Sequence, residues 1–429
     1  MRTLKTLVIA ALLLSMAGVA VAELQNVEVG GKLRIRGNYY RMDDFGATSS
    51  VEQRTMLNVK ADFTNDVSTF IEFDSYNNWG QGFRSDYLTG IDTRGGSDVN
   101  LYQAYINVKN LWGTPLSLRV GRQELVFGSE WLLGNNDGNA YFTGLSYDAI
   151  RLTFANDMFK ADAFAAKLAE TYQNFGKGDT DLYGVYGSYI GIEDVTIDAY
   201  WLFLVDNRFQ DTTGITTDFH TFGLRGAGTL SGFDFDVEAA YQMGNIDGIP
   251  GACPLGFGDD ADVDYDGFGA NVVLGYTFDM AWQPRVYGKF AFLDGGQRDN
   301  DCWSNDYTMP FNRLFSDVDY SLFLDNNSNL TNLMFYSLGV QVMPTECVSL
   351  QLMGAYLDTE ESYGDEGDLG WEVGVSGTYN YSEDLAFSAG YSHFFGSDWD
   401  TTEDCPVYDW DGDKSADFDY FWMQTEISF

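Results

Sequence analysis

Arginines recur at polar positions of two neighbouring segments whose side chains alternate in polarity. Residues 116–127 read LSLRVGRQELVF and residues 147–154 read YDAIRLTF. Arg119 and Arg151 fall on the polar face of these segments, and Arg122 lies close by in the sequence. A guanidinium stays charged at every physiological pH and can match a carboxylate with two parallel hydrogen bonds. Around a water-filled bore, such side chains could guide anionic or polyhydroxylated solutes.

Similar alternating segments follow one another along the whole chain. A period of two over about ten residues is typical of a strand with two different faces. These segments predict about eighteen strands, which is an even number. The expected starts are Val27, Glu52, Val67, Val99, Leu116, Tyr147, Met158, Asp181, Asp194, Asp218, Gly232, Asp264, Gln283, Thr331, Glu346, Leu369, Glu383 and Asp417.

The connections between these segments alternate between tight turns and long loops. Turns such as 64–66 and 155–157 contrast with loops such as 76–98, 128–146 and 294–330. An up-and-down meander produces this sorting when one end of a barrel faces the periplasm and the other faces the outside. A two-sheet sandwich has no reason to sort its loops in this way. We therefore predict an all-β fold, a transmembrane antiparallel up-and-down β-barrel of about eighteen strands.

Every second position of these strands is assigned to the outer surface. This outward series is almost free of charge and includes Leu33, Phe268, Leu338 and Trp371. A lipid-facing Arg or Lys near the bilayer midplane would cost about 2–4 kcal/mol, so the lack of charge favours contact with hydrocarbon. The chain also ends in an aromatic residue, Phe429, which resembles the terminal signature of bacterial outer-membrane barrels.

The opposite positions gather basic side chains, and acids such as Glu72, Asp198 and Glu238 share them. Two interpretations stay open. The charges could form a salt-bridged wall that holds a large barrel open, or a series of arginines that favours anionic or carbohydrate solutes. The predicted pore-lining cations are Lys32, Arg34, Arg36, Arg54, Lys60, Arg119, Arg122, Arg151, Arg225, Arg285 and Lys289.

The N-terminus and the composition indicate a protein of the cell envelope. Arg2 and Lys5 precede an apolar run that ends in an A-x-A site at Ala22. Residues 1–22 are therefore predicted to be a cleaved secretory signal peptide, and residues 23–429 a single outer-membrane β-barrel domain. No later apolar run is long enough to predict a transmembrane helix. The net charge of −40 argues against nucleic acid as a partner.

Three blocks of sequence resemble a known family. Residues 101–106 read LYQAYI, residues 119–125 read RVGRQEL with Gly128 downstream, and residues 147–152 read YDAIRL. These blocks look like the alginate-export family of outer-membrane porins, and the similarity is clearest from about residue 27 to residue 154. The resemblance implies an eighteen-stranded barrel in the bacterial outer membrane, in contact with its lipid. In the exporter, lumen arginines and lysines form an electropositive constriction for polyuronate. By position, the residues onto which that role could carry are Arg34, Arg36, Arg54, Arg119, Arg122 and Arg151.

Two departures from the exporter affect the expected solute. The exporter is plugged by a long periplasmic turn near its last strands, whereas the matching turns here, 343–346 and 381–384, are tight. External loops such as 258–266 and 403–419 are strongly acidic and would repel a polyanion at the mouth. We therefore expect a passive porin that prefers small anionic or carbohydrate solutes. Porins are often trimers, so a homotrimer is compatible with the resemblance, although the sequence carries no interface signal.

An acidic segment near the C-terminus is a candidate calcium site. Asp409, Asp411, Asp413 and Asp417 follow the spacing of the D-x-D-G-D-x-x-x-D calcium loop of propeller repeats, which this segment resembles. Hard cations such as Ca²⁺ prefer six to eight oxygen ligands. The alternative interpretation is an acidic surface loop. No other cofactor is expected.

Other reactive residues offer little chemistry. The four cysteines suit an oxidising compartment, but their pairing cannot be deduced from sequence. His220 and His393 stand alone, which argues against a serine hydrolase. Asp234 and Asp236 share a face as a glycosidase pair would, but are expected to line the pore.

Transport is therefore the first hypothesis, and an enzyme ranks last. The alternative is a structural or adhesive surface barrel with acidic, calcium-binding loops. Inward folding of loop 294–330 that filled the bore would favour that alternative.

Overall fold

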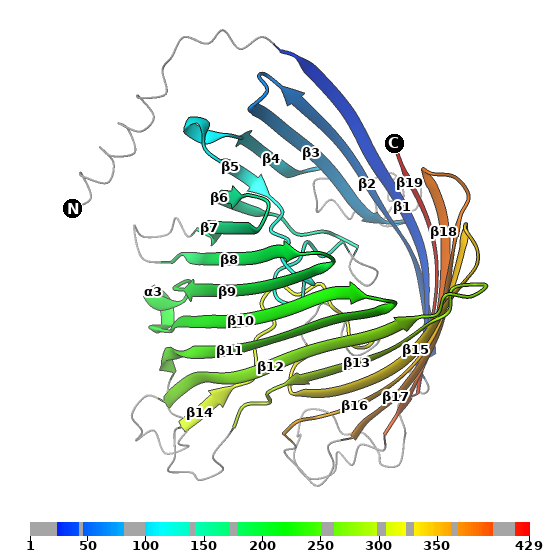
Figure 1. Cartoon of the computed structure of the whole chain (residues 1–429). Helices are drawn as coiled ribbons and strands as arrows, with labels where there is room; N and C mark the ends of the chain where they lie inside the picture. The colour runs from blue at the N-terminus through cyan, green and yellow to red at the C-terminus, as the bar shows by residue number, and fades with distance from the viewer. Residues whose placement is uncertain are drawn as a thin grey trace.

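The computed structural model is built almost entirely of β-strands (Figure 1). It describes residues 24–42, 46–80, 99–137, 142–170, 178–249, 261–297, 306–322, 330–361, 368–397 and 417–429. The first nine strands are β1 (Asn26–Met42), β2 (Gly46–Asp62), β3 (Val67–Asn78), β4 (Asn100–Val108), β5 (Leu116–Gln123), β6 (Tyr147–Ala155), β7 (Phe159–Ala169), β8 (Thr180–Ile192) and β9 (Val195–Asp206). The next are β10 (Thr216–Leu230), β11 (Phe233–Ile249), β12 (Ala261–Thr277), β13 (Arg285–Leu293), β15 (Leu333–Thr345), β16 (Val348–Asp358), β17 (Asp368–Asn380), β18 (Leu385–Gly396) and β19 (Phe418–Ser428).

These eighteen strands form one closed antiparallel wall, which confirms the predicted fold. The sheet curves round until the first strand, β1, lies beside the last, β19 (Figure 1). Their pairing runs from Lys32 opposite Ser428 to Met42 opposite Phe418. Gly31 and Phe429 extend this seam with two backbone hydrogen bonds of 3.0 Å. Closure leaves the wall without an exposed sheet edge.

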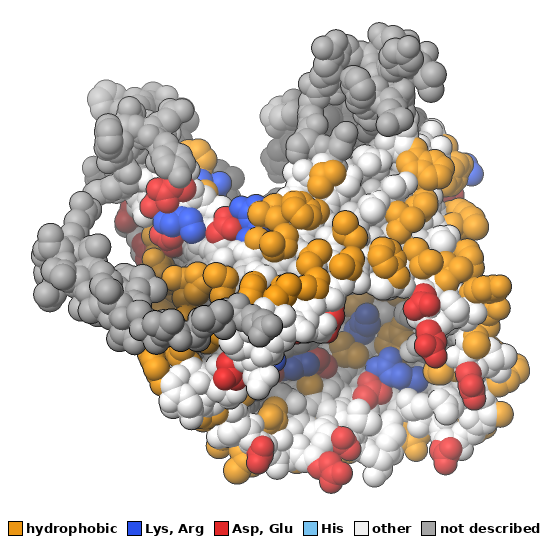
Figure 2. Space-filling model, turned by 90° about the horizontal axis from the view of Figure 1, so that it is seen from above, with side chains coloured by type: hydrophobic (Ala, Val, Ile, Leu, Met, Phe, Trp, Pro, Cys, Tyr) orange, Lys and Arg blue, Asp and Glu red, His pale blue; other side chains and the backbone are white. Residues whose placement is uncertain are grey.

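Alternation along each strand separates an apolar outer surface from a polar inner one. On β15, Tyr336 and Leu338 are exposed to the outside, whereas Phe335 and Ser337 are buried on the inside. Apolar side chains cover much of the outer surface in the space-filling view (Figure 2). This division is the one that a wall between lipid and an aqueous bore requires.

A nineteenth strand, β14 (Asp306–Met309), lies within loop 294–332 and was not predicted. Strand β13 is shorter than β12 and pairs with it only from Gly269 onward. Strand β14 pairs in parallel with the remaining part of β12, opposite residues 262–265. It therefore satisfies backbone groups of β12 that β13 leaves unpaired.

Helical structure is minor in the described residues. It consists of a 3-10 turn, η1 (Leu111–Gly113), and a single turn, α3 (Gln210–Thr213). No helix in this part of the chain has the length and apolarity that crossing a bilayer demands.

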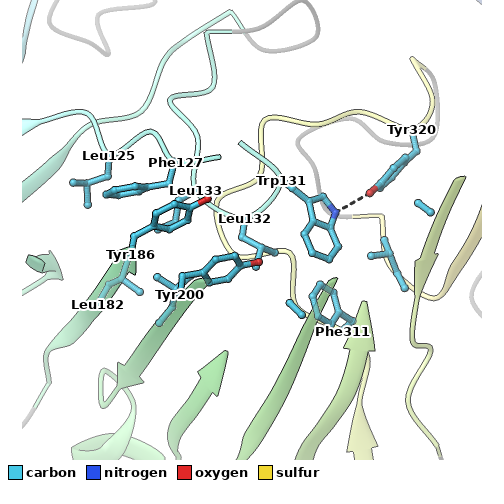
Figure 3. Packing of buried hydrophobic residues seen from close by; sticks show 14 of the residues in the cluster. Leu125, Phe127, Trp131, Leu132, Leu133, Leu182, Tyr186, Tyr200, Phe311 and Tyr320 are labelled. Atoms are coloured by element: carbon cyan, nitrogen blue, oxygen red, sulfur yellow. Dashed lines mark hydrogen bonds between the residues drawn. The ribbon is translucent and has the colours of Figure 1, made fainter. Parts of the chain in front are cut away.

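The hydrophobic core lies inside the barrel, where two loops meet (Figure 3). Loop 124–146 and loop 294–332 are joined by a parallel bridge between Leu133 and Phe315. The indole of Trp131 stacks on Phe311, with ring centroids 5.5 Å apart, and donates a hydrogen bond of 2.8 Å to the Tyr320 hydroxyl. The same cluster includes side chains from the inner face of the wall, namely Leu182, Tyr186 and Tyr200.

Candidate pore site

The bore is hollowed and lined by charge. Viewed from above, the molecule has a central hollow in which Lys and Arg side chains lie beside Asp and Glu side chains (Figure 2). All but one of the predicted pore-lining cations lie on the inward positions of their strands. These inward residues are Lys32, Arg34, Arg36, Arg54, Lys60, Arg119, Arg151, Arg225, Arg285 and Lys289.

The exception is Arg122, whose predicted place in the bore is wrong. It lies three residues after Arg119 on β5, and an odd spacing puts the two side chains on opposite faces. Its neighbours on the outer face, Val120 and Ile150, are exposed. Arg122 instead makes two hydrogen bonds, of 2.9 and 2.8 Å, with Asp148 on β6. Side-chain exposures of 42% and 55% show that this pair lies on the outer surface.

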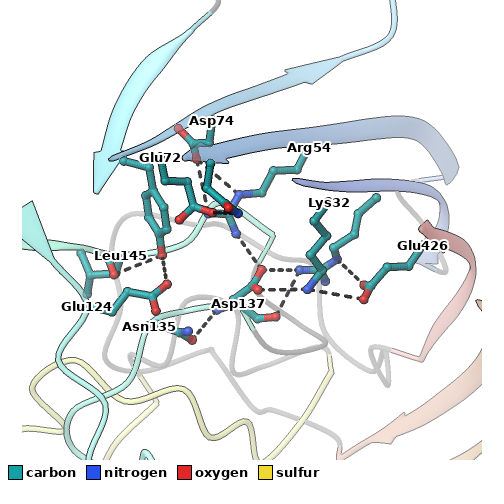
Figure 4. Close-up of polar contacts among 12 residues, drawn as sticks. Lys32, Arg54, Glu72, Asp74, Glu124, Asn135, Asp137, Leu145 and Glu426 are labelled. Atoms are coloured by element: carbon teal, nitrogen blue, oxygen red, sulfur yellow. Dashed lines mark hydrogen bonds and ion pairs between the residues drawn. The ribbon is translucent and has the colours of Figure 1, made fainter. Parts of the chain in front are cut away.

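Three inward cations converge on a single carboxylate supplied by loop 124–146 (Figure 4). Arg34 Nη1 and Arg54 Nη1 each donate to Asp137 Oδ1 at 2.6 Å. Lys32 Nζ donates to the other oxygen at 3.2 Å. Arg34 Nη1 also donates to the Asp137 carbonyl at 3.1 Å. Charge-assisted hydrogen bonds of this length are among the strong ones in proteins.

The wall supplies further counter-ions to the same cations. Arg54 lies 3.3 Å from Asp74, and Arg34 and Lys32 each lie 3.4 Å from Glu426. These distances exceed the shortest contacts to Asp137, so the loop carboxylate is the closest partner of both arginines.

Phe142 of the same loop covers two of these guanidinium groups. Its ring centroid lies 4.6 Å from the guanidinium carbon of Arg34 and 4.7 Å from that of Arg36. Arg36 is also paired with Glu52 at 2.9 Å. With the loop in place, Arg34 is 2% exposed, Arg36 5% and Arg54 1%. We refer to Lys32, Arg34, Arg36 and Arg54 as the sealed cluster.

Local hydrogen bonds set the position of Asp137. Its backbone N–H donates to Asn135 Oδ1 at 3.1 Å. The N–H groups of Gly144 and Leu145 donate to the carbonyls of Asn136 and Asn135. The two sides of the loop are therefore joined next to the carboxylate.

The base of the loop is tied to β4. Glu124 accepts a 2.7 Å hydrogen bond from the Tyr102 hydroxyl, and burial raises the pKa of Glu124 above its ordinary value. Burial disfavours the charged form of a carboxyl group, which accounts for the direction of this shift.

Most of the remaining inward cations are neutralised by acids on neighbouring strands. Arg151 pairs with Asp162, and Arg225 with Asp198, each at 2.8 Å. Arg285 Nε donates to Asp234 at 2.9 Å. Lys60 lies 3.2 Å from Glu28. For these residues, the interpretation as a salt-bridged wall describes the arrangement well.

Arg119 and Lys289 differ from the other inward cations. Arg119 is half-buried, lies over the Tyr105 ring at 4.3 Å and reaches Asn107 at 3.5 Å. Lys289 is exposed to the bore and lies 5.9 Å from the centre of the Tyr287 ring. Among the described residues, neither forms a salt bridge with an acid, and Lys289 is attracted by the Asp319 carboxylate at longer range. We refer to them as the open pair.

Sequence reasoning missed Asp137 and Phe142, which complete the sealed cluster. Both lie in a segment expected to be a loop, and no periodicity marks them. One signal was present, because Trp131, Leu132 and Leu133 form an apolar run in an otherwise polar loop. Such a run indicates a loop that packs against protein instead of facing water.

Several other predictions fall partly outside the described residues. Of the four aspartates of the candidate calcium site, only Asp417 is described, so calcium binding stays a prediction. Within the described ranges, no group of three or more potential metal ligands comes together. Cys347 is exposed and unpaired, and the other three cysteines lie outside these ranges. Both histidines lie among aromatic side chains, with His220 stacked on Phe203 and His393 packed against Phe395.

A closed eighteen-stranded wall with an apolar outside and a charged bore defines an outer-membrane β-barrel channel. The sequence comparison then gives the family, because residues 25–359 match the family model described as alginate export. The chain belongs to the alginate export family, and it is a channel for solute passage in the bacterial outer membrane. No curated protein matches it by sequence.

Solved structures of outer-membrane proteins share the fold. OccAB3 of Acinetobacter baumannii is 14% identical, with a TM-score of 0.59 over 94% of this chain and 100% of that one. OccK8 (OprE) of Pseudomonas aeruginosa is 12% identical, with a TM-score of 0.57 over 94% and 98%. The outer membrane protein OpdK of Pseudomonas aeruginosa is 10% identical, with a TM-score of 0.54 over 94% and 99%. At these identities the likeness concerns the fold.

Proposed function

We propose that this channel passes small anionic solutes, including charged carbohydrates, by diffusion, and that the open pair sets its preference for anions. The observation that carries this proposal is the contrast in pairing among the inward cations. Among the described residues, Arg119 and Lys289 reach the bore without a salt bridge, and the acid that acts on Lys289, Asp319, does so only at longer range. A salt-bridged cation presents little net field to a passing ion, whereas a cation without a salt bridge presents much more of its charge.

The size of the effect follows from Coulomb's law. A unit charge 4 Å from an anion contributes about 1 kcal/mol in bulk water and about 4 kcal/mol at the effective dielectric constant near a protein surface. A narrow aqueous bore lies between these limits. Even 1.4 kcal/mol corresponds to a tenfold difference in local concentration, so two such cations suffice to bias ion passage.

The test is the reversal potential of the purified full-length protein in planar bilayers under a gradient of KCl. We expect the wild-type channel to favour chloride, and Arg119→Gln with Lys289→Gln to move the reversal potential toward the value for potassium. The matched control is Arg122→Gln, which removes an arginine from β5 on the outer surface. It should leave the reversal potential unchanged.

Two results would overturn the proposal. One is a wild-type channel without preference for chloride. The other is a double variant whose reversal potential equals that of the wild type. A shift with Arg122→Gln as large as that of the double variant would also contradict it, because the effect would then not depend on the bore.

The proposal contains no enzymatic step. Asp234 and Asp236, the pair that could imitate a glycosidase, are hydrogen-bonded to Arg285 and Arg225. His220 accepts a hydrogen bond of 3.1 Å from the Trp201 indole, and His393 lies 2.8 Å from Asp419. These contacts suit structural roles in the wall. A homotrimer stays a prediction, to be tested by the mass of the detergent-solubilised protein.

The structural alternative makes a different prediction for the same experiment. It expects negligible conductance, because the described parts of loops 124–146 and 294–332 fold inward and meet inside the barrel. The hollow seen from above supports passage instead (Figure 2). Channels of measurable conductance in the bilayer would exclude the filled bore.

A further inference from the structure

The sealed cluster is a carboxylate-binding arrangement that already holds a carboxylate. Lys32, Arg34 and Arg54 all direct donors at Asp137, and the two oxygens of that side chain accept from all three. With Asp137 in place, Arg34 and Arg54 are almost wholly buried. A solute in the bore therefore has no access to these donors while Asp137 occupies them.

We propose that Asp137 is an internal competitor of anionic solutes, an autoinhibitory contact that a solute carboxylate must displace to reach Arg34 and Arg54. The inference rests on the proposed function, because it assigns a regulatory contact to the same bore. It differs in the residues involved, since Arg119 and Lys289 lie against Tyr105 and Tyr287 of the wall and not against Asp137.

The wall can carry the cluster without Asp137. Arg54 keeps Asp74, Arg36 keeps Glu52, and Lys32 and Arg34 keep Glu426. Within the described part of the chain, Asp137 is the carboxylate that a loop, not a strand, adds to this group. When a solute displaces Asp137, each cation of the sealed cluster therefore keeps a counter-ion on the wall.

The base of the loop is held differently from Asp137 itself. Leu125, Trp131 and Leu133 are completely or almost completely buried in the apolar cluster. By contrast, the Asp137 side chain is 19% exposed, and its contacts are hydrogen bonds and ion pairs. An arriving carboxylate can replace the three bonds to the Asp137 side chain, so only the bond from Arg34 to the Asp137 carbonyl has no counterpart.

What favours Asp137 over the solute is its tether. A tethered group competes at an effective concentration set by its attachment, commonly in the millimolar range for short flexible links. Free solute reaches the cluster only when its concentration approaches that value. Removing the Asp137 carboxylate should strengthen solute binding by the same factor, about tenfold if the effective concentration exceeds the dissociation constant tenfold.

The experiment compares block of chloride current by glucuronate in bilayers containing wild-type, Asp137→Asn or Asp137→Glu protein. We expect the half-blocking concentration of glucuronate to fall about tenfold in Asp137→Asn and to stay near the wild-type value in Asp137→Glu, which keeps a competing carboxylate. Neutral methyl glucoside should block all three channels alike. The matched control is Asp148→Asn, an acid on the outer surface, which should behave like the wild type.

Equal glucuronate affinity in the wild type and Asp137→Asn would overturn the inference. Equal gains in glucuronate affinity in Asp137→Asn and Asp137→Glu would also overturn it. Should Asp137→Asn fail to form channels, Trp131→Ala, which removes the anchor of the same loop, must show the gain in affinity instead. Failure of the proposed function is recognisable separately, because the wild-type reversal potential and the Arg119–Lys289 variant report it without reference to Asp137.

Discussion

The sealed cluster and the open pair lie in the same bore and carry the same kind of charge, but they differ in what neutralises them. Every cation of the sealed cluster has an acidic partner, and three share the loop carboxylate of Asp137. Arg119 and Lys289 rest on aromatic rings. The difference shows that the number of cations in a lumen does not measure its preference for anions. What counts is the charge that remains after the pairs are formed.

The largest expected difference between the two regions is in stability. Arg54 is 1% exposed and shares its hydrogen bonds between Asp74 and Asp137. Arg54→Met leaves those carboxylates short of a partner, and breaking a buried ion pair by removing one side typically costs about 3–5 kcal/mol. Arg119→Met loses a cation–π contact with Tyr105, which for a half-buried pair is worth about 0.5–2 kcal/mol.

The measurement is urea unfolding in detergent micelles, followed by tryptophan fluorescence. Arg54→Met should shift the midpoint to clearly lower urea than Arg119→Met. Similar midpoints for the two variants would show that the sealed cluster contributes no more to folding than the open pair does, and the comparison would fail.

Sequence alternation was sufficient to predict the barrel, the strand count and the side of the wall on which most cations lie. It succeeds because the period of two separates lipid-facing from lumen-facing positions on every strand. The prediction for Arg122 was wrong because it relied on nearness to Arg119 in the sequence, whereas the face of a strand depends on odd or even spacing. Strict counting would have placed Arg122 outward, opposite Asp148.

Pairing inside the bore could not be predicted in this way. Asp137 reaches Arg34 across 103 positions of the chain and Arg54 across 83. Loop residues have no period that would reveal such contacts, and their direction depends on where the loop base is anchored. In the sequence, the apolar run at 131–133 was the one feature that indicated inward folding of loop 124–146. Whether an inward cation is open or sealed is therefore a property of the tertiary structure.

Trp131 anchors the loop that holds Asp137 in the sealed cluster. Trp131→Ala removes the ring that stacks on Phe311 and the donor to Tyr320. Loss of a buried aromatic side chain typically costs about 3–5 kcal/mol. Because this contact joins two loops, we expect the loss to appear as local loosening inside the bore, with less effect on the closed wall.

Single-channel conductance should therefore rise in Trp131→Ala, and its fluctuations should become larger. The matched control is Trp371→Ala, which removes an exposed tryptophan from the outer surface of β17. A conductance that stays at the wild-type value in Trp131→Ala would mean that the two loops do not restrict the bore.

The smallest expected effect concerns the fit between loop 124–146 and the sealed cluster. Gly144 has a φ of 74°, and a Cβ added there would collide with the Arg54 guanidinium and with the Tyr102 hydroxyl. Gly214 has a similar φ of 81°, but an added Cβ would meet open space. Both Gly→Ala variants carry the cost of the left-handed conformation, roughly 1–2 kcal/mol. Only Gly144→Ala should also push the loop away from Arg54, so it alone should increase glucuronate block, although by less than Asp137→Asn. If Gly144→Ala and Gly214→Ala give the same half-blocking concentration, the fit at Arg54 does not control access to the cluster.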